Sequence, residues 1–173
     1  VSSGDPGVFA MAAAVFEALE NGPEDWLNID INVLPGITAM LAASARAGAP
    51  LGHDFCAINL SDNLKPWSII EKRLRLAAEA DFAMAFYNPR SKSRPEGFER
   101  TLEILKDACG DDRPVIFARN VSRPDETIKI VPLSQTTPDM ADMRTMVLVG
   151  SSQTRIIERE IGPIVYTPRS LAK

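Results

Sequence analysis

The sequence predicts an α/β protein: the remainder of a parallel-sheet first domain followed by a second α/β domain with a mixed sheet. Three observations lead to this prediction. Tight turns rich in small residues lead straight into helical patterns at residues 2–7 and 34–38. Helical periodicities alternate with short apolar runs such as residues 81–87, which are typical of strands covered on both faces. A late succession of strand patterns without helices between them indicates a mixed sheet.

The first domain is expected over residues 1–48, and it opens on a turn that enters a helix. Asp5 can cap this helix, Pro6 suits its first turn, and Gly4 allows close approach of the backbone. Apolar residues at helical spacing predict a helix from Val8 to about residues 21–23, where Asn-Gly-Pro stops it.

A strand and a second helix complete this first part. Residues 26–34 predict a loop followed by a strand, because isoleucine and valine alternate with aspartate and asparagine. The turn at Pro35 and Gly36 starts an alanine-rich helix, which we expect to pack closely on a neighbour and to end at Gly48. Residues 49–52 predict the linker to the second domain.

The second domain is expected over residues 49–173. Strand patterns occupy residues 55–61, 81–87, 114–120 and 146–150, and helical patterns occupy residues 67–77 and 98–109. Residues 126–133 alternate in polarity and predict an antiparallel hairpin partner.

Composition narrows the function classes. With 45% hydrophobic and 24% charged residues the chain can bury a normal core, and a net charge of −4 argues against general nucleic-acid binding. We expect no membrane association, because no apolar run is long enough to span a bilayer. Two isolated cysteines, Cys56 and Cys109, indicate buried reduced thiols in a cytoplasmic protein, and a single histidine argues against a metal site.

Several motifs follow one another along the whole chain: Ser-Gly-Asp-Pro-Gly at 3–7, Leu-Pro-Gly-Ile-Thr-Ala at 34–39, Ala-Pro-Leu-Gly-His-Asp-Phe at 49–55, Leu-Ser-Asp at 60–62, Phe-Tyr-Asn-Pro-Arg-Ser at 86–91 and Ala-Arg-Asn-Val at 118–121. In this order they resemble the tetrapyrrole methylase family, and within it the ring-contracting enzymes of cobalamin biosynthesis. The resemblance implies S-adenosyl-L-methionine as cofactor, S-adenosyl-L-homocysteine as product, a tetrapyrrole substrate, a homodimer, and an active site in the cleft between the two domains.

The same resemblance implies that the chain lacks the amino-terminal part of its first domain, because it begins at Val1 on the motif turn. In the family that part carries most of the first sheet and a glycine-rich loop of the cofactor site. We therefore expect this chain alone to bind the cofactor weakly and to be inactive, with apolar helix faces exposed or paired between two copies.

The resemblance implies cofactor contacts at turns in both domains, namely at Ser3, Gly4, Asp5, Val8, Thr38, Ala39, Tyr87, Asn88, Asn120 and Val121. The sequence departs from many relatives in one of these places, because they have Gly-Thr where this chain has Val121 and Ser122. A valine cannot adopt the conformations open to glycine. For Asp5, a structural role as helix cap stays open.

Catalytic and substrate-binding candidates lie on loops. Ring contraction, implied by the resemblance, requires proton removal from a hydroxyl, for which His53 and Asp62 are the acid/base candidates. A histidine that only hydrogen-bonds across the linker is the alternative. Two basic loops are expected to receive substrate carboxylates, since arginine pairs with them in bidentate fashion, and ordinary solvated loops are the alternative. These loops carry Arg90, Lys92, Arg119 and Arg123.

Other functions stay open from the sequence. The equivalent enzyme of the cobalt-containing route has the same chemistry, and protein or ribosomal RNA methylases have the same fold. A nucleotide-binding regulatory module could use the turn at residues 4–7 for phosphate, but the turn lacks a Gly-Lys-Ser/Thr ending and Asp5 would repel phosphate. The absence of a catalytic triad does not argue against a methyltransferase, because the activated methyl group needs mainly orientation.

Overall fold

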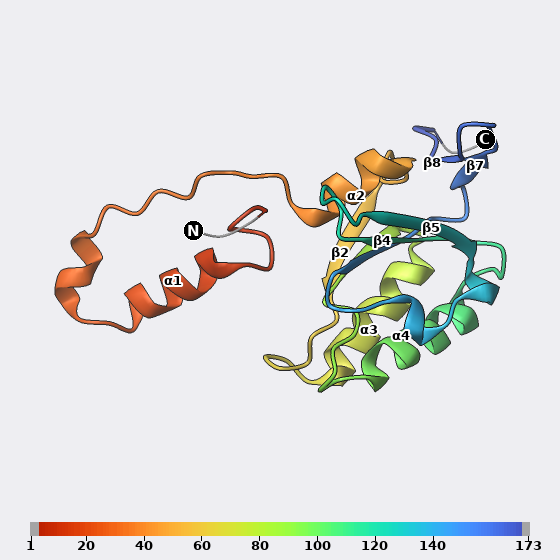
Figure 1. The fold of residues 1–173 in the computed structure, drawn as a ribbon. Helices are drawn as coiled ribbons and strands as arrows, with labels where there is room; N and C mark the ends of the chain where they lie inside the picture. The colour runs from red at the N-terminus through yellow and green to blue at the C-terminus, as the bar shows by residue number, and fades with distance from the viewer. Residues whose placement is uncertain (1–3, 171–173) are drawn as a thin grey trace.

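A five-stranded mixed sheet forms the centre of the protein in a computed structural model that describes residues 4–170 (Figure 1). The strand order is β2-β3-β6-β4-β5, where only β2 and β3 are parallel. Because β6 runs antiparallel between β3 and β4, its first residue lies at the same edge of the sheet as the carboxyl ends of β3 and β4. The bounds are β2 Phe55–Asn59, β3 Ala83–Tyr87, β4 Pro114–Arg119, β5 Thr127–Pro132 and β6 Thr145–Val149.

Two amphipathic helices, α3 (Trp67–Glu79) and α4 (Glu96–Ala108), cover one face of this sheet. Phe98 of α4 is fully buried and meets Phe117 of β4 edge to face, with ring centroids 6.2 Å apart. Burying a side chain of this size stabilises the fold by about 1.5–3 kcal/mol. The sequence patterns for both helices, and for the antiparallel β4–β5 pair, are confirmed.

Helix α2 (Ala39–Ala47) covers the other face. Its buried Ala43 and Ala47 share a core with Ala85 and Leu148 of the sheet, so the small side chains allow the close packing that the sequence predicts. The helix ends at Gly48, whose φ of 132° only glycine adopts easily.

A second, three-stranded sheet in the order β1-β8-β7 joins α2 to the carboxyl-terminal part of the chain. Its strands are β1 (Gly48–Ala49), β7 (Arg155–Ile157) and β8 (Ile164–Tyr166). The boundary expected between residues 48 and 49 falls inside β1. The structure therefore groups α2 with the strands of the expected second domain rather than with the residues before it.

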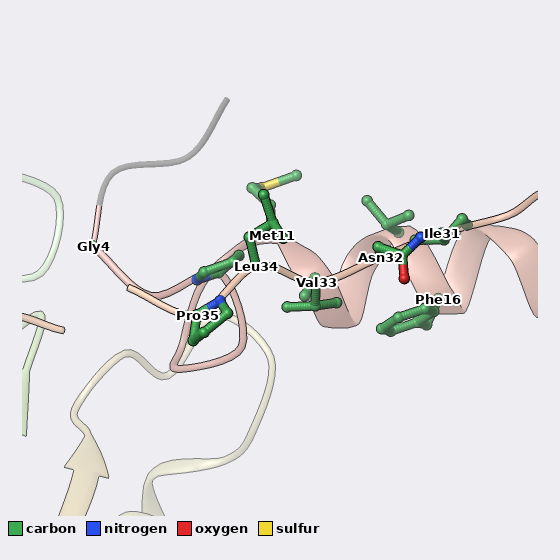
Figure 2. A pocket seen from close by; sticks show the side chains of 11 residues that line it. Gly4, Met11, Phe16, Ile31, Asn32, Val33, Leu34 and Pro35 are labelled. Atoms are coloured by element: carbon green, nitrogen blue, oxygen red, sulfur yellow. The ribbon is translucent and has the colours of Figure 1, made fainter. Parts of the chain in front are cut away.

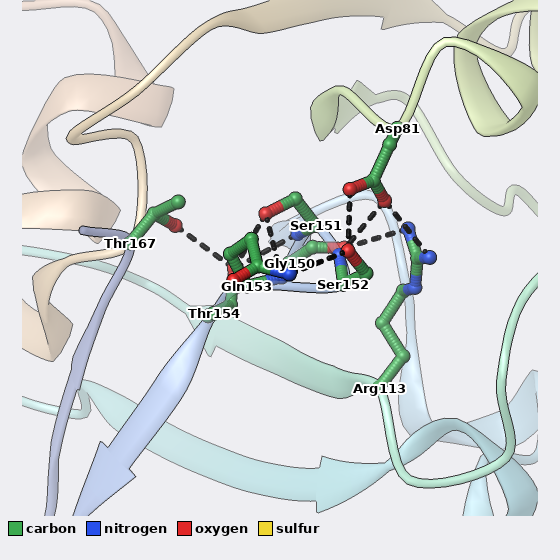
Figure 3. A network of polar contacts seen from close by, with 8 residues as sticks. All are labelled: Asp81, Arg113, Gly150, Ser151, Ser152, Gln153, Thr154 and Thr167. Carbon is green, nitrogen blue, oxygen red and sulfur yellow. Dashed lines mark hydrogen bonds and ion pairs between the residues drawn. The ribbon is translucent and has the colours of Figure 1, made fainter. Parts of the chain in front are cut away.

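A hydrogen-bonded network holds the edge of the main sheet at which β6 ends (Figure 3). Asp81 accepts hydrogen bonds from the Ser152 amide at 2.8 Å and from its hydroxyl at 2.6 Å, and pairs with the buried Arg113 guanidinium at 3.0 Å. The Thr154 hydroxyl lies 2.8 Å from that of Thr167, beyond β8. The network thereby ties the β6–β7 loop to β3, β4 and the residues after β8.

The residues before α2 extend away from the two sheets (Figure 1). Helix α1 (Met11–Glu20) and a 3-10 turn, η1 (Glu24–Asn28), are followed by extended backbone to residue 38. The prediction of a strand within residues 26–34 is wrong, because this stretch forms no strand pairing with any described residue. The helix also begins later than predicted, since Phe9 has a φ of 51°.

No residue of α1 is buried, in agreement with the exposed apolar helix face expected from the sequence. A groove of about 490 Å³ runs between α1 and residues 31–35, where Met11 and Phe16 face the extended segment (Figure 2). Among residues 4–170, no helix is long and apolar enough to cross a membrane.

Candidate active site

A cavity of about 710 Å³ lies where the amino-terminal turns meet the carboxyl ends of β3 and β4. Its walls come from five segments: residues 4–10, the start of α2, the end of β3, the loop after β4 and the start of β6. Every cofactor residue predicted from the sequence that the structure describes lines this one cavity: Gly4, Asp5, Val8, Thr38, Ala39, Tyr87, Asn88, Asn120 and Val121. The remaining one, Ser3, lies outside the described residues.

Asp5 joins the two glycine-containing turns of the cavity. Its carboxylate accepts a hydrogen bond from the Gly7 amide at 2.8 Å and one from the Gly36 amide at 3.1 Å. These bonds, that of Gly36 first, lower the pKa of Asp5 below its ordinary value of 3.8. The suggestion that Asp5 caps the first helix is wrong, because α1 has Ala10 at its N-cap position.

The two turns touch through their glycines. A side-chain carbon added to Gly36 would collide with the carbonyl oxygen of Gly4 and would lie 3.0 Å from its carbonyl carbon. Gly4 itself has a φ of 75°, a conformation that glycine adopts without strain. Gly36 is therefore required by the close approach of the two turns, and Gly4 is favoured by its own backbone conformation.

Tyr87 fixes the start of α2 against the end of β3. Its hydroxyl forms a short hydrogen bond with that of Thr38 and accepts one from the Met40 amide at 3.3 Å. The Tyr87 ring also packs on Phe9, with centroids 4.9 Å apart and a 56° angle between the rings. Tyr87 thus holds three walls of the cavity in register.

Residues with left-handed backbone gather in the cavity wall. Phe9, Asn88, Asn120 and Ser122 have φ angles of 50–65°. Such conformations cost free energy in residues other than glycine and occur preferentially at functional sites. Val121 is not among them, so valine at this position meets no conformation that would require the glycine of the relatives.

Side-chain hydrogen bonds hold these turns in place. The Asn88 amide donates to the Asn59 side-chain oxygen at 3.2 Å, and the Asn120 amide donates to the Asp125 carboxylate at 2.6 Å. Asparagine tolerates the left-handed region better than most residues, which fits its use at both turns. The ends of β3 and β4 are therefore rigid where they meet the cavity.

Glu126 ties the loop after β4 to α2. Its carboxylate accepts a hydrogen bond from the Ser122 amide at 2.7 Å and pairs with the Arg46 guanidinium at 2.7 Å. The bond from Ser122 and then that from Arg46 lower the pKa of Glu126. The carboxylate therefore stays ionised and keeps the loop closed against the helix.

The structure separates the two acid/base candidates. Asp62 follows the carboxyl end of β2, at the cavity's edge of the sheet, and its carboxylate lies 3.8 Å from the Arg94 guanidinium. His53 precedes the amino end of β2, with Nδ1 3.7 Å from the Asp54 carboxylate. Strands of five residues separate the two edges by about 13 Å at ~3.3 Å per residue. His53 is thus not placed beside the cavity.

The four predicted substrate-binding cations take different positions. Arg123 lines the main cavity, while Arg90 and Lys92 line a second cavity of about 590 Å³. Arg119 is engaged with two acids: its Nε donates to Asp142 at 2.9 Å, and its Nη1 lies 3.9 Å from Asp125. The structure therefore does not bring the four side chains to one point.

Arg144 lines both cavities and was missed by the sequence analysis, as was its neighbour Met143. These residues precede β6, and only the antiparallel insertion of β6 between β3 and β4 brings them to this edge. No motif surrounds Arg144, so the sequence carried no signal for it.

Comparison with known proteins identifies the family. A sequence model described as Tetrapyrrole (Corrin/Porphyrin) Methylases matches residues 1–137. The chain belongs to the tetrapyrrole methylase family. The resemblance noted in the sequence is thereby confirmed.

Two curated tetrapyrrole methylases and one crystal structure indicate the branch of the family. The precorrin-3B C(17)-methyltransferase of Sinorhizobium sp is 57% identical and aligns with 99% of this chain and 68% of its own length. A probable cobalt-factor III C(17)-methyltransferase of Salmonella typhimurium is 37% identical, with 98% of this chain and 67% of that protein covered. The crystal structure of the methyltransferase CobJ is 65% identical with a TM-score of 0.90, covering 97% of this chain and 68% of that one.

The chain is thus a homologue of precorrin-3B C(17)-methyltransferase with the α/β fold of the tetrapyrrole methylases. The mixed sheet expected from the sequence is confirmed. This methylase spans about two thirds of the length of the relatives just described.

Proposed function

We propose that this chain takes part in S-adenosyl-L-methionine-dependent methylation of precorrin-3B at C17, with ring contraction to precorrin-4, in cobalamin (vitamin B12) biosynthesis. The observation that carries the proposal is the meeting of all the described cofactor candidates in one cavity. They come from segments far apart in sequence. The identity of 57% to a precorrin-3B C(17)-methyltransferase supports the choice of substrate.

The residues around the main cavity suit S-adenosyl-L-methionine. A volume of about 710 Å³ lies within the range of small-molecule sites, roughly 300–1,000 Å³. Apolar Val8 and Ala39 lie in the wall together with polar Thr38 and Asn120, as a ligand with an aromatic base and polar groups requires. When bound, the cofactor supplies a sulfonium-activated methyl group.

The chain's own residues then have to orient and enclose the reactants. The rigid turns at Asn88 and Asn120 fix the walls, so that a bound ligand loses little further freedom in reaching a reactive alignment. Residues 4–10 form one wall of the cavity, where Phe9 packs on Tyr87 at the end of β3. For the proton removed during ring contraction, Asp62 is a stronger candidate than His53, because it lies at the same edge of the sheet as the main cavity.

The proposal includes a cytoplasmic homodimer. Cys56 and Cys109 are free and half-buried, and burial raises the pKa of both thiols, which suits a reducing compartment. The uncovered apolar side chains of α1 and residues 29–37 suit burial against further protein. Sedimentation of the intact protein at micromolar concentration should give twice the monomer mass, and a monomer would contradict this part of the proposal.

Mass spectrometry tests the activity. The intact protein is incubated with S-adenosyl-L-methionine carrying a deuterated methyl group and with either precorrin-3B or cobalt-factor III. We expect one labelled methyl group in a ring-contracted product from precorrin-3B. Transfer to the cobalt-containing substrate alone would assign the protein to the other route, and no transfer to either would refute the proposed function.

A pair of variants tests the proton acceptor. Asp62→Asn should abolish ring contraction, whereas His53→Ala should retain it. Calorimetric titration with S-adenosyl-L-homocysteine controls for damage to the cofactor site, since neither residue lines the main cavity. An active Asp62→Asn variant together with an inactive His53→Ala variant would reverse the assignment.

A further inference from the structure

The second cavity, of about 590 Å³, is lined by cations from two segments. Arg90, Ser91 and Lys92 come from the loop after β3, and Arg144 comes from the turn before β6. Met143 and Arg144 also line the main cavity, so the two cavities share one wall. A ligand held in the main cavity could therefore extend one of its substituents into the second cavity.

The positive charge of this cavity is not neutralised by its own acid. Within residues 4–170, none of Arg90, Lys92 and Arg144 forms an ion pair. The acid in the lining is Asp142, and its carboxylate is engaged by Arg119 at 2.9 Å. The positive charge of Arg90 helps to lower the pKa of another acid, Asp139, although no ion pair joins the two side chains.

Asp142 also accepts two hydrogen bonds from the turn that follows it. Its second oxygen accepts from the Thr145 hydroxyl at 2.8 Å and from the Arg144 amide at 2.9 Å. Burial alone would raise the pKa of Asp142, but the bonds from Arg119, Thr145 and Arg144 together lower it. Asp142 thus stays ionised and serves the turn that carries Arg144, rather than the cations of the cavity.

Arg90 provides an unused donor. Its Nε atom is buried and has no hydrogen-bond partner among the described residues. Buried donors in folded proteins almost always have an acceptor, and the guanidinium group suits a carboxylate. An anionic acceptor in the second cavity would satisfy both the orphan donor and the excess positive charge.

We propose that the second cavity binds a peripheral carboxylate of the tetrapyrrole substrate, with Arg144 and Arg90 as ligands and Lys92 at its rim. This inference rests on the proposed function, because corrin precursors carry acetate and propionate groups around the macrocycle. It also changes the role of Arg119, which acts as a positioning residue: through Asp142 it holds the turn that presents Arg144.

Substrate binding without turnover tests the first part. The intact protein, saturated with S-adenosyl-L-homocysteine, is titrated with precorrin-3B and followed by absorbance. Arg144→Ala should weaken substrate binding at least tenfold, and Arg144→Lys should restore part of the loss. Because Arg144 also lines the main cavity, S-adenosyl-L-homocysteine affinity is measured for each variant, and the loss of substrate affinity should exceed any loss of cofactor-product affinity. Arg159→Ala is the matched control, because Arg159 is exposed and its side chain donates a hydrogen bond within its own loop, to the Gly162 carbonyl.

The salt dependence adds a second readout. Wild-type substrate affinity should fall as salt rises, because the carboxylate contact is electrostatic, and the fall should be shallower in Arg144→Ala. Unchanged substrate affinity in Arg144→Ala, in a protein whose wild type methylates precorrin-3B, would overturn the inference while leaving the proposed function standing. No methylation by wild type would refute the function itself.

A double-mutant cycle tests the role of Arg119. If Arg119 acts through the Asp142 turn, then Arg119→Ala should weaken substrate binding, and the double variant with Arg144→Ala should bind no more weakly than Arg144→Ala alone. Losses that multiply in the double variant would show that Arg119 contacts the substrate itself. Asp142→Asn should resemble Arg119→Ala, and an Asp142→Asn variant with wild-type affinity would remove the positioning role.

Discussion

Gly36→Ala tests the idea that the cavity depends on close contact between its two turns. The added carbon would overlap the carbonyl oxygen of Gly4 and lie 3.0 Å from its carbon, whereas ordinary contact begins at 3.4 Å. Because both opposing atoms belong to the backbone, no side chain can rotate away. Relieving the carbon contact alone moves the turns apart by about 0.4 Å, and the oxygen requires more. The same movement stretches the bond from the Gly36 amide to Asp5.

We expect Gly36→Ala to weaken S-adenosyl-L-homocysteine binding at least tenfold and to lower methyl transfer on the order of a hundredfold, since a displacement near 1 Å in a site has about that effect on rate. Calorimetric titration of the intact protein measures the affinity. Gly97→Ala is the matched control: its added carbon would lie 3.6 Å from Trp67, an ordinary contact, in the first turn of α4. Wild-type affinity in Gly36→Ala would refute the reasoning.

Three other predictions follow from the same structure. Asp5→Asn should abolish the acid-induced loss of S-adenosyl-L-homocysteine affinity. Backbone hydrogen bonds lower the pKa of Asp5, so its carboxylate stabilises the folded turns above about pH 4, and this stabilisation is lost as the pH falls below 3.8. Titration of wild type and variant at a series of pH values measures the difference. Phe98→Ala should lower the free energy of unfolding by about 3–5 kcal/mol in urea denaturation, because the side chain is fully buried; a loss under 1 kcal/mol would contradict the packing described. Cys56 and Cys109 should react slowly with a disulfide reagent at pH 7 and at full rate after unfolding, since burial raises both pKa values.

Local sequence patterns correctly predicted most of the main sheet and the helices that cover it. Helices α3 and α4 follow from apolar spacing, and β3 and β4 follow from uninterrupted apolar runs. The candidates at residues 87, 88, 120 and 121 lie together because β3 and β4 end at one edge of the sheet. The turns before α2 follow no strand and meet this edge through the contacts of Tyr87 with Phe9 and Thr38.

The wrong strand and the elements missed by the sequence analysis have a common cause: each depends on pairing between segments that are distant in the sequence. Residues 29–33 alternate as a strand does, but alternation cannot supply a partner strand. Strands β7 and β8 are three residues each, too short for a period to be recognised, and they exist through pairing with each other and with β1. Arg144 reaches the site only through the position of β6 in the sheet, which no local pattern encodes.

The pairing of β1 with β8 connects the cavity to residues more than a hundred positions away in the sequence. Val165 packs in one core with Ala43 and Ala47 of α2, and Thr167 bonds back to Ala49 at 3.0 Å and to Pro50 at 2.5 Å. Loss of β8 would remove this anchor and leave α2, whose first turn lines the main cavity, packed only on the main sheet. A cut in the chain far from the cavity would therefore weaken one of its walls, although no residue of β8 lines it.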